Sequence, residues 1–381
     1  MIMNEKEIGE IRRRMRRDRS NMTAVYGCYV NTQKEMIAEF KQSLGMMPEN
    51  EAEKYFALFK RTLSGGLGKN LLDIAFRTNQ VADSPEHKLL MDLRASRLDD
   101  KDARFALYRK IIESVNLQEN YLILLGHESY DVPFKSKDDE TQKDASGDVY
   151  TYFSCAVCPV KEAKSALRYV AEQKEFHDGG LAQVVSAPEI GFLFPTFDAR
   201  ATNIYNVLFY TRSPKAAHEE LISNLFNLKA PKCAADQKKS FEAVLMTSLG
   251  EECSLDVVQG VHDNLYQSIQ MHKESKTADP LLVGKEEISM ALRDCSVAEK
   301  ERAKFNVAFD EAFGFDAQLH PKNLINNSKL EIKTPDVVIK VNPERSDLVE
   351  TRVIGGVKYI LICADENVEV NGVNIQIKDE A

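Results

Sequence analysis

Six arginines within eight residues form the most concentrated positive feature of this sequence: Arg12, Arg13, Arg14, Arg16, Arg17 and Arg19. A guanidinium group binds phosphate oxygens through paired N–H donors, so such a cluster suits contacts with RNA, DNA or an anionic surface. Nothing in the segment offers a shaped reader of base edges, so we expect contacts with phosphates rather than bases. The competing interpretation is a solvated helix face, which is what most charge runs are.

Three polar residues follow the apolar run Tyr121–Leu125 and are the candidates for catalysis: His127, Glu128 and Asp131. Sites often lie just beyond the end of a central strand, so an enzyme acting on a small or phosphorylated substrate is an alternative function. No familiar triad, metal-binding spacing or phosphate loop accompanies these residues. The sequence therefore assigns no residue a catalytic role.

The same polar stretch extends over residues 126–148 and holds further acidic side chains: Asp138, Asp139, Glu140, Asp144 and Asp148. Carboxylates together with a histidine can bind a metal ion. The spacing matches no calcium loop, however, and interleaved lysines reduce the negative field. We therefore predict a solvated surface loop here, with no metal and no cofactor.

Cys155 and Cys158 are the one close cysteine pair in the chain. On a continuous strand, residues three apart point to opposite faces, so the two sulfur atoms could not meet. A redox pair needs its first cysteine in a turn that opens a helix, and a predicted helix over 161–171 leaves that alternative open. No second pair stands nearby to complete a zinc site. We predict reduced, buried thiols without metal.

Four apolar runs of strand length make up the centre of the chain: Tyr121–Leu125, Thr151–Val157, Ile190–Phe197 and Ile204–Thr211. Charges are nearly absent within them, which is typical of strands buried on both faces. The connector 198–202 has a common hairpin length, so the last two runs should be antiparallel neighbours. We predict that all four runs share one central, mainly antiparallel sheet.

Apolar residues at helical spacing predict helices over residues 4–19, 33–44, 49–63, 86–96, 100–115, 161–171, 236–249, 254–274 and 284–313. A short strand is predicted at Thr23–Val30. The tail alternates strand-like runs with the turns Gly355-Gly356 and Asn371-Gly372, which predicts an antiparallel β-meander over 328–377. The predicted fold class is therefore α+β: a central sheet flanked by helices, then a helical stretch and the meander.

This pattern divides the chain into three predicted parts. They are a basic N-terminal helix (1–20), an α+β domain with the central sheet (21–213), and a helical segment that carries the β-meander (214–381). A chain of 381 residues is long enough for one large or two ordinary domains.

Composition excludes several broad classes of protein. The net charge of −9 argues against a uniformly basic nucleic-acid coat, although it allows a local basic patch. No apolar run approaches the roughly 20 residues of a membrane span, and the charged N-terminus does not resemble a signal peptide. Seven scattered cysteines, an odd number, lack the spacing of a disulfide framework. We therefore expect a cytoplasmic protein that does not enter the membrane.

Several stretches spread over nearly the whole chain match one bacterial family: Tyr26-Gly27-Cys28-Tyr29-Val30, Lys60-Arg61-Thr62-Leu63-Ser64-Gly65, Gly68-Lys69-Asn70-Leu71-Leu72, Tyr121-Leu122-Ile123-Leu124-Leu125, Tyr130-Asp131-Val132-Pro133, Cys158-Pro159-Val160, Gly191-Phe192-Leu193-Phe194-Pro195 and Lys333-Thr334-Pro335-Asp336-Val337-Val338-Ile339-Lys340-Val341. Through them the chain resembles the family known as domain of unknown function 4317. The resemblance brings no assigned activity, so it transfers no functional residue to this sequence.

A looser resemblance concerns only the order of elements. Phe309–Phe315, Lys329–Lys340 and Val353–Ile362 look like the tail of the 37-kilodalton nucleoid-associated protein family in pattern. With the arginine cluster, this resemblance implies a non-enzymatic protein that binds nucleic acid or a nucleoprotein partner. The enzyme built on His127, Glu128 and Asp131 comes second. A homo-oligomer such as a homodimer, which pairs through the C-terminal meander without a ligand, comes third.

Overall fold

Contacts between residues divide the chain into two compact units. Unit 1 comprises Met1–Ala234 and Ala278–Pro280, and unit 2 comprises Ala235–Thr277 and Leu281–Ala381. The computed structural model describes residues 3–135, 141–142, 148–163, 167–170, 172, 174–178, 182–216, 218–275, 277, 279–315, 317–364 and 368–375.

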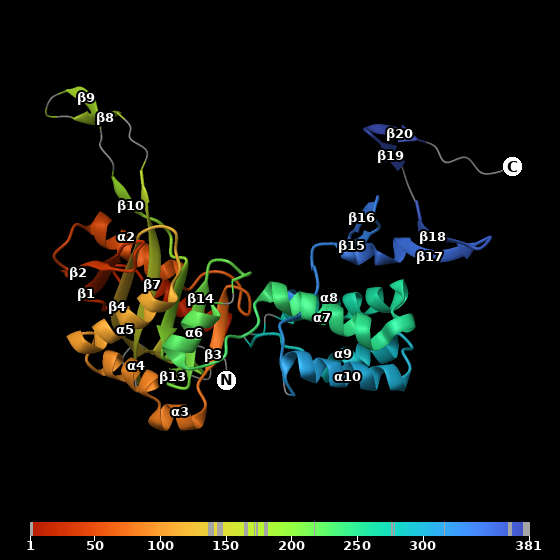
Figure 1. Cartoon of the computed structure of the whole chain (residues 1–381), viewed down its shortest axis with the longest axis horizontal. Coiled ribbons are helices and arrows are strands. Elements are labelled where there is room, and N and C mark those ends of the chain that lie inside the picture. Colours follow the sequence, from red (N-terminus) through yellow and green to blue (C-terminus); the bar gives the residue numbers. More distant parts are fainter. Residues whose placement is uncertain are drawn as a thin grey trace. The chain divides into compact units, whose positions relative to one another are not determined.

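An eight-stranded antiparallel sheet forms the centre of unit 1 (Figure 1). Its strands lie in the order β2 (Met36–Ser43), β1 (Ala24–Val30), β4 (Tyr121–Val132), β7 (Asp148–Glu162), β11 (Ile190–Phe194), β14 (Asn206–Thr211) and β3 (Leu71–Ala75), and β10 (Gln183–Val185) pairs with the end of β7. Each of the four apolar runs contributes a strand, and β11 and β14 are antiparallel neighbours. The predicted α+β fold and central sheet are therefore confirmed.

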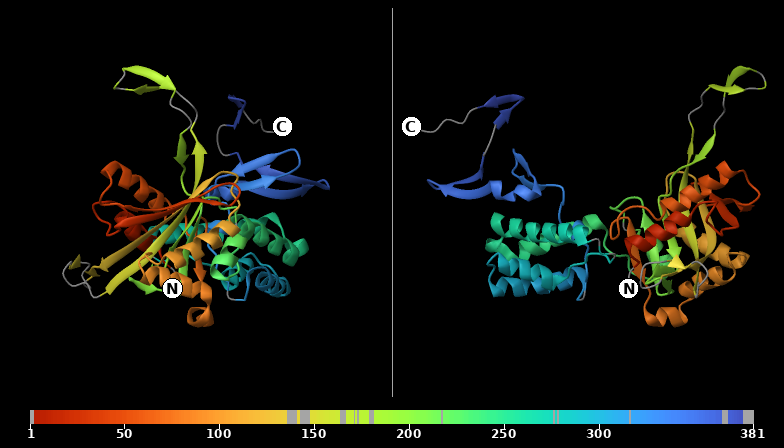
Figure 2. Two further views of the ribbon diagram at one scale, coloured as in Figure 1. Left: turned by 60° about the vertical axis from the view of Figure 1, so that its left-hand side comes forward. Right: turned by 180° about the vertical axis from the view of Figure 1, so that it is seen from behind.

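Helices cover both faces of this sheet. On one face lie α4 (Pro85–Ala95), α5 (Lys101–Ser114) and α6 (Glu219–Phe226), and the short α3 (Thr78–Asp83) precedes them (Figure 1). The other face carries α1 (Glu5–Arg14) and α2 (Glu49–Arg61), which come forward when the molecule is turned by 180° (Figure 2). Every residue of β11 and β14 is buried, as expected for strands between two helical layers.

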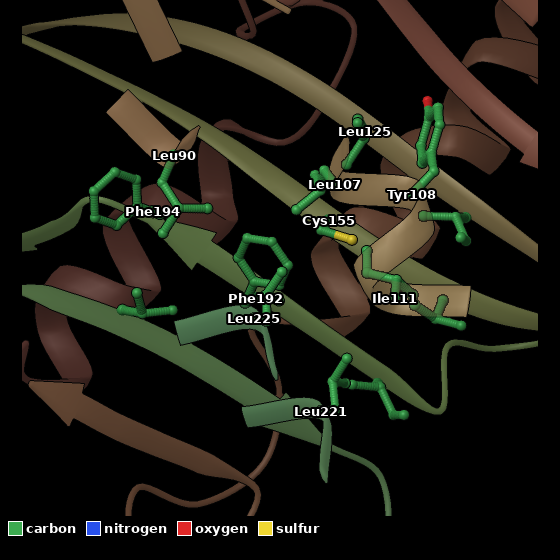
Figure 3. Close-up of a cluster of buried hydrophobic side chains, with 14 of the residues drawn as sticks. Leu90, Leu107, Tyr108, Ile111, Leu125, Cys155, Phe192, Phe194, Leu221 and Leu225 are labelled. Atoms are coloured by element: carbon green, nitrogen blue, oxygen red, sulfur yellow. The ribbon is translucent and has the colours of Figure 1, made fainter. Parts of the chain in front are cut away.

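The two layers are separate hydrophobic clusters with the sheet between them. In the first, Phe192 and Cys155 of the sheet pack against Leu107, Ile111 and Leu225 of the helices (Figure 3). The second layer uses the alternate residues of the same strands together with apolar side chains of α1 and α2: Ile8, Ile11, Met15, Phe56, Phe59, Leu124, Cys158, Leu193 and Leu208. The apolar stripe predicted for the N-terminal helix is thus buried.

The predicted helix over 33–44 is wrong, because this segment is strand β2. A tight turn, in which the Asn31 side chain accepts hydrogen bonds from the backbone of Gln33 and Glu35, sends the chain back along β1. Phe40 then lies directly over Gly27, where an added Cβ would stand 2.0 Å from the phenyl ring. The helical spacing of apolar residues was coincidental, and pairing with β1 decides the structure.

Two further sequence predictions are corrected by the length of the central strands. Residues 126–132 are not loop but the second half of β4, paired with β7 as far as Val132 and Asp148. The predicted helix over 161–171 is also wrong: β7 continues to Glu162, and β8 (Leu167–Val170) pairs with β9 (Glu175–Asp178). Residues 136–140 and 143–147 of the predicted acidic loop lie outside the described residues. The short pairs β5 (Phe134–Lys135) with β6 (Thr141–Gln142), and β12 (Thr196–Asp198) with β13 (Ala201–Asn203), complete unit 1.

Unit 2 begins with helices that share a hydrophobic cluster: α7 (Ala234–Leu249), α8 (Leu255–Ser275), α9 (Lys285–Asp294), α10 (Glu299–Phe313) and α11 (Pro321–Leu324). The predicted helix over 284–313 is divided, as expected, and Ser296 lies in the break with a positive φ of 64°. No helix among the described residues combines the length and apolar character that crossing a lipid bilayer requires.

The C-terminal strands pair as three antiparallel hairpins: β15 (Leu330–Lys333) with β16 (Val338–Val341), β17 (Val349–Ile354) with β18 (Val357–Ile362), and β19 (Val368–Val370) with β20 (Val373–Ile375). Gly355 and Gly356 both have positive φ, 58° and 82°, as a two-residue hairpin turn requires. The predicted strands and turns are confirmed, and each described pair is a two-stranded sheet of its own.

Candidate functional site

The six arginines straddle the end of helix α1. The helix begins at Asn4, whose side chain accepts from the backbone of Glu7 while the Glu7 carboxylate accepts from the backbone of Asn4. It ends at Arg14 rather than Arg19, because Met15 leaves helical geometry (ψ 69°) and turns into the core. The last three arginines therefore lie in a turn, where side chains no longer share a helix face.

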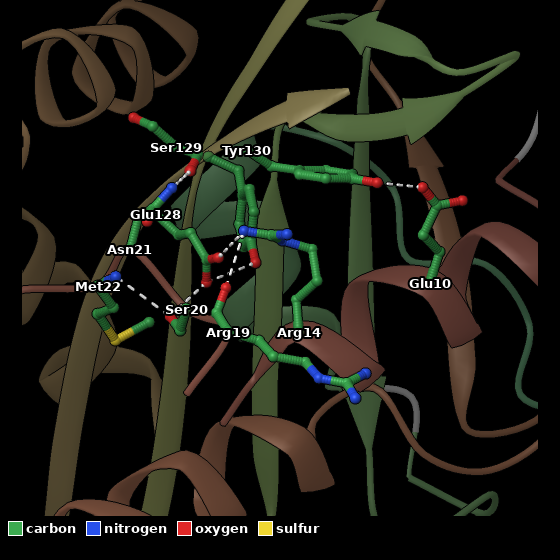
Figure 4. Close-up of polar contacts among 10 residues, drawn as sticks. Glu10, Arg14, Arg19, Ser20, Asn21, Met22, Glu128, Ser129 and Tyr130 are labelled. Carbon is green, nitrogen blue, oxygen red and sulfur yellow. Dashed lines mark hydrogen bonds and ion pairs between the residues drawn. The ribbon is translucent and has the colours of Figure 1, made fainter. Parts of the chain in front are cut away.

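Arg14 points into the protein. Its Nη2 atom donates to Glu128 Oε1 at 3.3 Å and to the carbonyl oxygen of Arg19 at 3.0 Å (Figure 4). The guanidinium also lies 4.0 Å from the centre of the Tyr130 ring, a cation–π contact. An arginine engaged by a carboxylate, a carbonyl and a ring is a structural anchor, with little capacity left for an external phosphate.

Glu128, the partner of Arg14, is fully buried. Its Oε2 atom accepts from Ser20 Oγ at 2.8 Å (Figure 4). The same atom accepts from Tyr152 Oη at 3.2 Å. Burial raises the pKa of this carboxyl, and the Ser20 hydrogen bond and the Arg14 charge oppose that shift. The segment after α1 is thereby tied to strand β4, and Asn21 adds a second tie by donating to the carbonyl oxygen of Ser129 at 2.8 Å.

Arg17 is also bonded to the protein. Its Nη1 atom donates to the Met47 carbonyl oxygen at 3.1 Å, and its backbone N–H donates to Glu53. Arg16 and Arg19 are exposed and both contact the exposed Asp18, at 3.1 and 3.7 Å. Arg12 and Arg13 are exposed as well, and neither makes an ion pair with another described residue. The predicted cluster thus separates into two inward anchors and four outward groups.

The three candidate catalytic residues do not form one site. They lie on β4, where successive side chains point to opposite faces: Glu128 faces the layer of α1 and α2, and His127 and Asp131 face the other side. Asp131 is exposed. A strand rises about 3.4 Å per residue, so His127 and Asp131 start roughly 13 Å apart along it. This geometry offers no mechanism that uses the three residues together.

His127 lies instead in a cleft of about 370 Å³ that is lined by Asn21, Thr23, Ala24, Tyr26, Lys41, Arg97, Asp99, His127 and Ser129. Sequence reasoning found His127 but missed the cleft's charged groups, Lys41, Arg97 and Asp99. These come from β2 and from the turn after α4, segments far apart in the chain, and no spacing in the sequence links them. If the predicted strand had been continued past Leu125, the alternation of side chains along it would have placed His127 and Glu128 on opposite faces of the sheet.

The cysteine pair behaves as predicted for strand geometry. Cys155 and Cys158 are both buried without a disulfide, and they belong to the hydrophobic clusters on opposite faces of the sheet. Burial raises the pKa of the Cys158 thiol to about 12 and that of Cys155 further, so both are protonated at neutral pH. Within the described ranges, no three His, Cys, Asp or Glu side chains gather closely enough to hold a metal ion.

Comparison with known proteins identifies the family and nothing narrower. No curated protein and no solved structure matches this chain, so the looser likeness to nucleoid-associated proteins stays a prediction. One family model, described as a domain of unknown function (DUF4317), matches residues 3–373. That match spans both units and almost every described residue, and the chain therefore belongs to the DUF4317 family.

Proposed function

We propose that this protein binds a nucleic acid, alone or within a nucleoprotein, through the exposed guanidinium groups of Arg12, Arg13, Arg16 and Arg19. The observation that carries the proposal is how their backbone is held. The four outward arginines belong to a segment that Arg14, Arg17 and Ser20 attach to the rest of unit 1 by hydrogen bonds. Groups already held in place lose less conformational freedom when they bind.

The chemistry of these four groups favours phosphate contacts. Each guanidinium is permanently charged and presents donors that match phosphate oxygens. Asp18 offsets part of the charge of Arg16 and Arg19, whereas Arg12 and Arg13 have no acidic partner in the part of the chain that the structure describes. Such contacts carry no sequence information, so affinity should depend on salt and hardly on base sequence.

A salt titration of duplex affinity tests the proposal. The wild type is compared with the triple variant Arg12→Glu, Arg13→Glu, Arg16→Glu, which leaves the anchors Arg14 and Arg17 in place. We expect weak binding that falls steeply with salt in the wild type. The log–log slope of the variant should be smaller by about 0.9 for each phosphate that it no longer neutralises. Binding to unrelated duplexes should decline alike.

The matched control makes the same charge change elsewhere, at the exposed Lys239, Arg293 and Lys300 of unit 2, each to Glu. If both triple variants lose affinity equally, net charge rather than the N-terminal segment is responsible. A wild-type protein that binds no duplex even at low salt would show that the proposal is wrong.

A second candidate is self-assembly through the C-terminal hairpins. Hairpin β17–β18 exposes apolar side chains that a buried strand would cover: Val353 (68%), Ile354 (53%) and Val357 (54%). Open strand edges with such side chains pair readily with another copy. Sedimentation velocity over a range of concentrations tests this candidate, and a mass that stays monomeric at every concentration would exclude it.

A further inference from the structure

We propose that the cleft beside His127 binds a small ligand that carries an oxyanion group, either a phosphate or a carboxylate. Its walls come from three parts of unit 1: the start of β1 with the residues just before it, strand β2 with the turn after α4, and the second half of β4. The site is separate from the outward arginines, since none of those arginines lines it.

One wall of the cleft is formed by Lys41, Asp99 and Tyr26, whose side chains are joined by hydrogen bonds and together carry no net charge. Lys41 Nζ donates to Asp99 Oδ1 at 2.7 Å, and Tyr26 Oη donates to the same oxygen at 2.5 Å. Hydrogen bonds from Lys41 and then Tyr26 lower the pKa of Asp99, so this carboxylate stays ionised. The charges of Lys41 and Asp99 offset each other, so the net charge of the cleft is set by the other residues that line it.

Arg97 supplies the unbalanced positive charge. Its side chain is exposed at the cleft and makes no hydrogen bond or ion pair with any other described residue. Its backbone, with that of the next residue, is left-handed: φ is 56° at Arg97 and 66° at Leu98. Consecutive non-glycine residues in this region are strained, and such strain concentrates at binding sites.

The strained turn is locked in place from inside. The Leu98 side chain is completely buried, and its backbone N–H donates to the Leu93 carbonyl oxygen at 2.9 Å. The guanidinium of Arg104 adds a further hold by donating to the Leu98 carbonyl oxygen at 2.5 Å. The backbone of Arg97 is therefore held rigidly, and its positively charged side chain extends into the cleft from a fixed position. An anionic ligand binds more tightly to a charge that is already held in place.

His127 completes the polar lining. Burial, followed by the charges of Arg97 and Arg94, lowers its pKa to about 4, so the imidazole is neutral at physiological pH. Its Nε2 atom is buried and has no hydrogen-bond partner among the described residues. A neutral imidazole can donate from one ring nitrogen, and the hydroxyl of Ser129 and the amide of Asn21 stand in the same lining.

The dimensions indicate a small ligand rather than a polymer. A neighbouring hollow of about 280 Å³ shares Arg97 and Ser129 with the cleft and is further lined by Met91, Arg94, Ala95 and Thr151. The volume of the cleft is at the lower end of the range for small-molecule sites, and that of the neighbouring hollow is slightly below it. The ligand's oxyanion would contact Arg97, where the two hollows meet, and its uncharged part would occupy one of them.

Isothermal titration calorimetry with pyrophosphate and with citrate tests the inference, and each probe represents one source of the oxyanion. The key variant is Arg97→Asn, because asparagine tolerates the left-handed backbone but lacks the charge. We expect at least a tenfold loss of affinity for whichever probe binds, about 1.4 kcal/mol. Arg97→Lys, which restores the charge, should recover part of it. Arg61→Asn, at an exposed arginine of α2, should change nothing.

A residue-specific readout accompanies the calorimetry. The saturating probe should move the imidazole resonances of His127, assigned by their loss in His127→Gln, in the wild type but not in Arg97→Asn. The inference would be overturned by any one of three results. The wild type binds neither probe, Arg97→Asn binds with unchanged affinity, or the His127 resonances do not move. The triple variant at Arg12, Arg13 and Arg16 should bind the probe normally, so failure of the nucleic-acid proposal is distinguishable from failure of this one.

Discussion

The eight-stranded sheet of unit 1 and the C-terminal hairpins of unit 2 are both antiparallel, but they reach opposite states of burial. Both are rich in Val and Ile, but the hairpin strands also carry charged residues such as Glu350, Arg352 and Lys358, which the four apolar runs of the sheet lack. Strand β14 buries all of its residues, whereas β17 buries only its first. Helices cover the sheet on both faces, whereas most residues of β17 and β18 are exposed.

This comparison separates two sources of strand stability. The sheet is held by side chains that interlock with two helical layers, and that packing is worth several kcal/mol at each large residue. A hairpin depends on its turn and its cross-strand pairs, each worth about 0.2–1 kcal/mol. An isolated two-stranded hairpin is only marginally stable in water. Strand-forming sequence therefore predicts where a strand occurs but not how firmly it is held.

The largest effect is expected from truncating a ring in the covered sheet. Phe209 of β14 is fully buried and packs edge-on against Phe226 of α6. Phe209→Ala should lower the free energy of unfolding by about 3–5 kcal/mol, because it removes apolar packing and leaves a cavity. Urea denaturation of the whole protein measures this loss. A loss below about 1 kcal/mol would mean that the two layers are not tightly packed.

A smaller, pH-dependent effect is expected at the edge of the same sheet. Asp73 of β3 accepts from Asn206 Nδ2 at 2.5 Å, while its Oδ1 atom has no partner among the described residues. Burial raises the pKa of this carboxyl from 3.8 to about 6, against the Asn206 hydrogen bond and with help from Asp198. The folded state therefore binds this proton more tightly than the unfolded state does.

The raised pKa of Asp73 makes the stability of the fold depend on pH. The stabilisation by protonated Asp73 is complete below pH 3.8 and is lost as the pH rises through about 6. Asp73→Asn, which can still accept from Asn206, should remove that loss and gain up to about 3 kcal/mol over the wild type above this range. The difference between the two stability curves measured from pH 4 to pH 8 is the test, and parallel curves would contradict it.

The smallest effect is expected in the exposed hairpin. Tyr359 of β18 is 43% exposed and pairs across the hairpin with Arg352. Tyr359→Ala should change the free energy of unfolding by no more than about 1 kcal/mol in the monomer. The same denaturation experiment compares it with Phe209→Ala. Equal losses at the two positions would show that the hairpin is buried in solution, which would favour the self-assembly candidate.

Sequence alone predicted what depends on local pattern. Apolar runs such as Ile190–Phe197 indicated the sheet, and helical spacing located α5 and α8. It failed at β2, where Phe40 has helical spacing yet is held by Gly27 of a neighbouring strand. It failed again after Leu125, since the polar residues of β4 resemble a loop until long-range pairing with β7 is known.

The candidate sites were less predictable than the fold, for a physical reason. A charge cluster shows how many arginines are present but not which of them turn inward, because the partner of Arg14 lies 114 positions away. The cleft around Arg97 is formed by pairing of β1 with β2 and β4 and by the turn after α4. Nothing in the local sequence of any one wall specifies the other walls.

His127 and Glu128 point to opposite faces of β4, and this alternation limits where the protein tolerates the insertion or deletion of a residue. Shifting this strand by one residue would send every side chain to the other face, because the side-chain period of a strand is two. The buried carboxylate would then face the side of Arg94 and Arg97, and the imidazole would face Arg14. A single-codon deletion between Gly126 and Ser129 should therefore be far less tolerated than any substitution there, whereas the exposed glycine turn of β17–β18 should accept insertions.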